Sequence, residues 1–243
     1  TIGLPYLLLS TTGPLVQAWF ARSFPDGTVY RLFALSNFAS LLALIGYPFL
    51  LEPWVATRSQ TWIWSGAYIL FAALVIAASI RSLRDQTDRG ASKPLADSLP
   101  EGAAPGLAEQ VSWLLLSALG SYLLLGISNH ITINVASIPF LWLLPLTLYL
   151  VTFILCFEGS GWYRRRLFMP LLFILLAGMA WGLHAEGSVL PILIEIPLYS
   201  AGLFVCCMFA HGELAAMRPA PRWLTRFYLM LSLGGALGGL MVG

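Results

Sequence analysis

Apolar residues gather in eight long stretches that are separated by shorter polar segments. A helix that crosses the hydrocarbon core of a bilayer needs about 20 mainly apolar residues. None of the stretches alternates apolar and polar residues as the strands of a membrane β-barrel do. We therefore predict an all-α, polytopic transmembrane helical bundle with about eight spans, at Ile2–Phe20, Leu32–Leu51, Thr61–Ile80, Val111–Asn129, Ile138–Phe157, Leu167–Leu183, Val189–Ala210 and Leu224–Val242.

Composition supports this prediction and excludes other classes of protein. Of the 243 residues, 58% are hydrophobic and 10% are charged, whereas about 25% of a typical soluble domain is charged. These values exclude a soluble globular domain and a disordered chain. The net charge of +2 argues against a nucleic-acid binder, which would carry a clustered basic face. We expect the lipid bilayer as a partner and no nucleic acid.

The placement of basic residues predicts an orientation. If the connections alternate between two sides, 12 of the 13 Lys and Arg residues fall on one side and Arg58 stands alone on the other. Short loops rich in Lys and Arg stay in the cytoplasm, so we expect the Arg-rich loops there. The first span would then begin outside and the last would end outside. Both ends of the sequence are apolar and look truncated from a longer protein.

One long polar segment divides the spans into two groups. Residues 83–109 mix Pro, Gly, Ser and charges of both signs, a composition typical of a flexible linker. We therefore expect three transmembrane helices in 1–82, a flexible cytoplasmic linker in 83–109 and five transmembrane helices in 110–243. The linker could divide two bundles, as the central loop of twelve-helix transporters does, or be only a long loop.

Ionisable residues inside spans are costly and indicate candidate sites. Glu195 lies one to two helical turns inside the predicted outer boundary. Other polar residues fall near the same side and could converge with it on an outer pocket, which would bind a cation or relay a proton. The alternative is a set of polar groups hydrated near the lipid headgroups. The candidate outer residues are Glu195, His130, Asn129, Asn134 and His184.

A second polar group follows the seventh span, on the inner side. Residues two apart on a helix do not share a face, so His211 and Glu213 are not expected to bind one ligand. We expect Glu213 to pair with an arginine of the following loop or of the linker. The inner-face cluster comprises His211, Glu213, Arg218, Arg222 and Arg226.

The last span carries two pairs of glycines with three residues between the members of each pair. Gly234 with Gly238, and Gly235 with Gly239, expose the backbone so that another helix can approach closely. We expect helix packing here, in which other membrane helices or subunits contact the Gly234–Gly239 face. No catalytic arrangement, metal-ligand spacing or cofactor motif is recognised, so we expect no cofactor, no metal and no catalysis by this chain itself.

Several strings together resemble a known family. They are Leu4–Phe20, Tyr30–Leu44, Gly126–Thr132, His211–Ala215 and Leu224–Gly239. The sequence is similar to the membrane half of bacterial fused proteins that join a major-facilitator-like region to a spermidine-synthase-like domain. The resemblance covers nearly the whole chain. It implies a major-facilitator-like bundle in the bacterial cytoplasmic (inner) membrane, whereas the soluble aminopropyltransferase-like domain of that family is missing from this sequence.

Two functions follow as hypotheses. The first is a transporter-like membrane domain that handles or senses a small polar or cationic solute such as a polyamine. It predicts a solvated cavity lined by Glu195 or His130. The second is a non-catalytic accessory subunit that is packed into a larger membrane complex, for example an energy-transducing one. It predicts that a helix from another chain covers the glycine face or another lipid-side surface.

Overall fold

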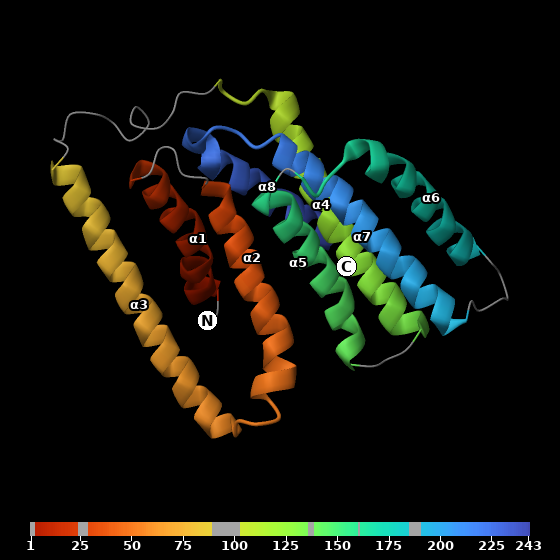
Figure 1. The fold of residues 1–243 in the computed structure, drawn as a ribbon, viewed down its shortest axis with the longest axis horizontal. Coiled ribbons are helices and arrows are strands. Elements are labelled where there is room, and N and C mark those ends of the chain that lie inside the picture. The colour runs from red at the N-terminus through yellow and green to blue at the C-terminus, as the bar shows by residue number, and fades with distance from the viewer. Residues whose placement is uncertain (1–2, 24–28, 89–102, 136–138, 160, 185–190) are drawn as a thin grey trace.

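A computed structural model describes residues 3–23, 29–88, 103–135, 139–159, 161–184 and 191–243 of the chain (Figure 1). These residues form helices joined by short connections and contain no β-strand, which confirms the all-α prediction. The main helices are α1 (Gly3–Ser23), α2 (Val29–Gly46), α3 (Thr57–Asp88), α4 (Leu107–His130), α5 (Leu143–Glu158), α6 (Arg165–His184), α7 (Ile192–Ala216) and α8 (Leu224–Leu240).

Five helical segments are long and apolar enough to cross a membrane. They are Val29–Leu51, Thr57–Arg84, Leu107–Ile133, Arg165–Leu183 and Ile192–Ala216. The apolar helix α5 is shorter, and its 16 residues span about 24 Å. A multi-pass helical membrane protein fits these lengths. The count of eight spans and the major-facilitator-like arrangement stay predictions.

Both ends of the predicted linker are helical in the structure. Helix α3 continues to Asp88, so residues 83–88 are helical, and α4 begins at Leu107. The start of α4 is stabilised by Glu109, whose Oε2 accepts a hydrogen bond from the amide of Gly106 at 2.9 Å. Such a bond satisfies a backbone donor that a helix leaves free at its first turn. Residues 89–102 of the predicted linker lie outside the described residues.

Helix α7 lies among α4, α5 and α6, while α8 packs closely along α4 and α2 along α5 (Figure 1). Large side chains fill the centre of this bundle, among them Trp113, Phe157 and Phe227, each at most 1% exposed. Helix α3 lies at the edge and has its main contact with α1. The contacts of α2 with α5, and of α4 with both α7 and α8, therefore form the core of the bundle, and this core positions the polar groups.

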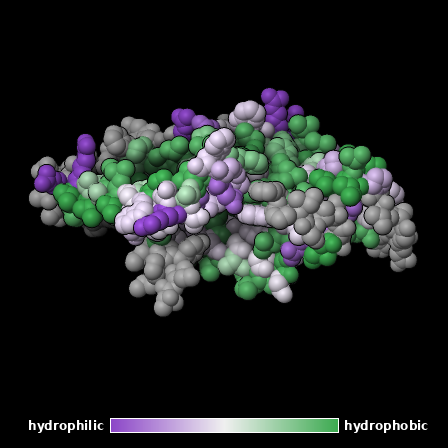
Figure 2. All heavy atoms as spheres, turned by 90° about the horizontal axis from the view of Figure 1, so that it is seen from below, coloured by the Kyte–Doolittle hydropathy of each residue, from purple (hydrophilic) through white to green (hydrophobic). Residues whose placement is uncertain are grey.

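The outer surface is apolar, as expected where helices meet lipid. Figure 2 shows hydrophobic side chains over much of one face, with hydrophilic ones in separate patches. On α3, the most apolar part has no buried residue, and Trp62 and Ile69 are 72% and 69% exposed. Such a surface is incompatible with water on all sides and supports contact with the bilayer.

Candidate functional site

The helices alternate in direction, so their ends gather at two opposite ends of the bundle. In Figure 1 the C-terminal ends of α1, α3, α5 and α7 lie at the top, and those of α2, α4 and α6 lie at the bottom. The top is called the arginine-bearing end, because the described Arg81, Arg84, Arg165, Arg222 and Arg226 lie there. The bottom is called the opposite end. It holds the last turn of α4 and the first turn of α7.

At the opposite end, His130 of α4 meets Glu195 of α7. The imidazole Nε2 lies 3.0 Å from the carboxylate Oε1, and the two side chains are 18% and 12% exposed. An N–H at Nε2 would donate to Glu195, since a carboxylate only accepts. Past His130 the backbone of α4 continues as a π-helical turn over Ile131–Val135, a feature often found at functional sites.

A third residue, the buried Tyr199, packs against the His130–Glu195 pair. It follows Glu195 by four residues on α7, so the two side chains share a helix face. Its ring centroid lies 4.3 Å from that of His130, and its hydroxyl donates to the carbonyl of Met179 at 3.2 Å. Tyr199 was not among the residues predicted from the sequence, although its four-residue spacing from Glu195 was a usable signal.

Two of the five candidate outer residues are therefore in contact. Asn129 is exposed. Asn134 lies in the π-helical turn and His184 ends α6, but their side chains lie outside the described residues. The arrangement is a His–Glu pair with an aromatic wall, and such a pair can hold a proton or a cationic group.

His211 is placed differently from the expectation of an inner-face cluster. Helix α7 continues to Ala216, so His211 lies inside the bundle and is 0% exposed. The hydroxyl of Thr152 donates to the carbonyl of Tyr149 at 2.8 Å and lies 2.9 Å from His211 Nδ1. Because that hydroxyl has one proton, Nδ1–H is the donor to Thr152. Nε2 is buried without a hydrogen-bond partner among the described residues.

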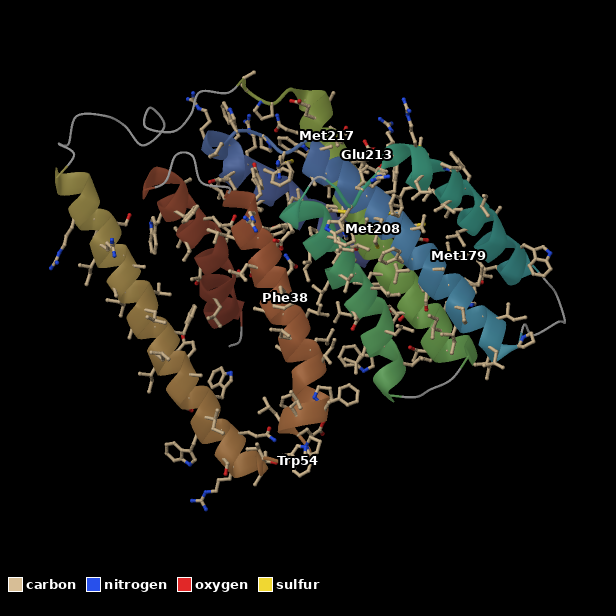
Figure 3. All side chains as sticks on the ribbon, in the orientation of Figure 1. Phe38, Trp54, Met179, Met208, Glu213 and Met217 are labelled. Atoms are coloured by element: carbon tan, nitrogen blue, oxygen red, sulfur yellow. The ribbon has the colours of Figure 1, made fainter. Side chains whose placement is uncertain are left out.

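Glu213 pairs with an arginine from an unexpected element. Its Oε1 accepts a hydrogen bond from the hydroxyl of Tyr163 at 2.7 Å and lies 3.4 Å from Nε of Arg165 at the start of α6. The expected partner was in the following loop or the linker. Burial, followed by the bond to Glu213, raises the pKa of Tyr163, which lies in the connection between α5 and α6. Figure 3 shows Glu213 near Met217, towards the arginine-bearing end, with Met208 deeper along α7.

The three arginines of the predicted inner-face cluster contact aromatic rings. Arg218 lies over Tyr30, with Cζ 5.5 Å from the ring centroid, and Arg222 and Arg226 both lie near Trp223. The five residues of the cluster therefore lie in four separate environments and do not form one site.

The glycine face of α8 packs on α4 of the same chain. A Cβ atom on Gly234 would come within 3.0 Å of the backbone of Leu114, and one on Gly238 would come as close to the backbone of Ala118. Gly235 and Gly239 lie at the rim of this contact. Other membrane helices or subunits were expected at this face, and the helix that packs on it here is α4 of the same chain.

Metal-binding groups do not gather in the described part of the chain. No set of three or more His, Cys, Asp and Glu side chains there could hold a metal ion. The three cysteines are buried as free thiols. Comparisons with models of protein families, with curated proteins and with solved structures find no match to this chain.

Proposed function

We propose that this chain is a transporter-like membrane domain that binds a small cationic solute at the His130–Glu195 pair. The observation that carries the proposal is the carboxylate of Glu195, which is 12% exposed, lies in an apolar helical bundle and contacts one titratable partner at 3.0 Å. Ionisable groups at membrane depth are costly, and they mark ion and substrate pathways.

The geometry indicates how a cation would bind. The carboxylate of Glu195 supplies the negative charge, and Tyr199, whose ring packs against His130, supplies an aromatic ring one helical turn further along α7. An ammonium group is attracted to both. The imidazole of His130 contacts the same carboxylate oxygen at 3.0 Å, so a cation that binds Glu195 would have to share or replace that contact.

The family resemblance supports a polyamine as the class of solute. A polyamine carries several ammonium groups on a flexible aliphatic chain, and this chemistry suits a carboxylate in apolar surroundings. The same resemblance supports the bacterial inner membrane as the location, with the arginine-bearing end in the cytoplasm.

Calorimetric titration of spermidine into the purified protein in lipid nanodiscs tests the proposal. We expect Glu195→Gln to weaken binding at least about tenfold, which corresponds to roughly 1.4 kcal/mol. Glu158→Gln is the matched control, because it removes the same charge from an exposed carboxylate that pairs with Arg31. Equal affinities of the two variants for spermidine would refute a site at Glu195.

A second function, an accessory subunit of a larger membrane complex, is favoured by one observation. Helix α3 leaves nearly all its surface outside the bundle and has its main contact with α1. A helix held so loosely by its own chain offers its apolar surface either to lipid or to another subunit.

A further inference from the structure

The connection between α7 and α8 is fixed to the bundle by two hydrogen bonds from other helices. The hydroxyl of Tyr30, on α2, donates to the carbonyl of Pro219 at 2.6 Å. The indole of Trp113, on α4, donates to the carbonyl of Met217 at 3.1 Å. Both donor residues are buried, at 7% and 1% exposure. The backbone that carries the arginines of this connection is therefore held in place by the bundle.

Two guanidinium groups, from residues four apart in the sequence, each lie near one indole where this connection joins α8. Cζ of Arg222 lies 5.4 Å and Cζ of Arg226 lies 5.7 Å from the ring centroid of Trp223. Like charges brought together repel each other unless an anion neutralises them. Within the described ranges no carboxylate forms an ion pair with either arginine, whereas Arg31 and Arg165 pair with Glu158 and Glu213.

An apolar strip continues from the arginine pair along α8. Leu229, Leu233 and Leu237 follow Arg226 at intervals of three or four residues, so they share one helix face. They are 53%, 44% and 46% exposed. The strip runs from the arginine-bearing end into the apolar part of the helix, in the direction that an acyl chain takes from its headgroup.

From these contacts we infer a binding site for an anionic phospholipid, whose phosphate lies between Arg222 and Arg226 beside Trp223. Guanidinium groups bind phosphate with two parallel hydrogen bonds each, and the bound anion removes their mutual repulsion. Indole rings prefer the headgroup level of a bilayer, which places Trp223 at the depth of the phosphate. The acyl chain lies along Leu229 and Leu233. The site is independent of solute binding at Glu195.

Native mass spectrometry of the protein, released from micelles that contain phosphatidylglycerol and phosphatidylcholine, tests the site. We expect the wild type to retain phosphatidylglycerol in preference to phosphatidylcholine. The Arg222→Gln/Arg226→Gln variant is expected to bind it about tenfold more weakly, the size of effect that follows from the loss of charge-assisted hydrogen bonds. The control is Arg81→Gln/Arg84→Gln, which removes two exposed charges at the same end of the bundle.

Three results would overturn the inference. Equal losses in the two double variants would show attraction to surface charge in general. Displacement of the lipid by excess inorganic phosphate would show that the arginines bind a free anion without the acyl chain. If the glutamine variant fails to fold, Arg222→Lys/Arg226→Lys keeps the charge but loses the paired hydrogen bonds, and wild-type retention of phosphatidylglycerol by that variant would also count against the site.

Discussion

Polar side chains inside the bundle bind one another or backbone carbonyls, as a lipid environment requires. Ser117 on α4 donates to the carbonyl of Leu231 on α8 at 2.7 Å, and Tyr228 on α8 donates to Gln17 on α1. These bonds fix which helix faces meet. Nε2 of His211 is an exception, because it is buried without such a partner among the described residues.

At the same scale, the two glycine pairs of α8 predict different tolerance to a methyl group. Gly238→Ala is expected to lower stability by about 1–3 kcal/mol, since its Cβ would overlap the backbone of Ala118 and the helices would have to separate. Gly239→Ala is the control, because its Cβ would lie 3.6 Å from Leu125, an ordinary contact. Thermal unfolding in detergent measures both. Equal midpoints for the two variants would contradict the close approach of α8 to α4.

Residue spacing explains what could be predicted at these positions and what could not. Four-residue spacing of glycines predicts a close helix contact, because it depends only on the geometry of one helix. It does not specify the partner, so the sequence left open whether a helix of this chain or another subunit packs there, and the helix found is α4. For the same reason, the sequence predicted His130 and Glu195 on one side of the membrane but could not show their 3.0 Å contact.

Among the elements, α7 carries three of the polar groups described above and has neighbours on several sides. Glu195, His211 and Glu213 lie along its length, and each meets a side chain of a different helix or connection. Helix α3 is the opposite case, with apolar residues around its whole circumference. Periodicity identifies an amphipathic helix by its apolar stripe, so a helix that is apolar all round does not reveal which of its faces meets a neighbour.

Spin labels along α3 distinguish lipid from a protein partner on this helix. Labels introduced one at a time from Ile69 to Ile76 are expected to be accessible to oxygen in reconstituted bilayers, because no residue of this stretch is buried and only Ala72 and Val75 are partly covered. Accessibility is measured by power-saturation electron paramagnetic resonance. A 3.6-residue period of low accessibility in native membranes, absent after purification, would instead indicate another subunit and support the accessory function.

For the whole molecule, the strongest prediction from sequence concerns the two ends of the bundle. Alternation of apolar stretches with basic connections places nearly all Lys and Arg residues at one end, and the antiparallel helices of Figure 1 agree with that alternation. Helix lengths were predicted less well, since α3 and α7 extend beyond their apolar stretches. Polar residues can continue a helix outside the bilayer, so hydrophobicity alone marks the crossing and not the helix end.

The orientation of this arrangement is tested by labelling cysteines in intact cells. Gly161→Cys lies in the connection next to the three consecutive arginines, and Ala56→Cys lies in the connection between α2 and α3. Because basic connections stay in the cytoplasm, a membrane-impermeant maleimide is expected to label Ala56→Cys and not Gly161→Cys. The three native cysteines are buried and serve as the unlabelled background. Permeabilised cells should label both variants, whereas labelling of Gly161→Cys in intact cells would invert the orientation and move the His130–Glu195 pair to the cytoplasmic side.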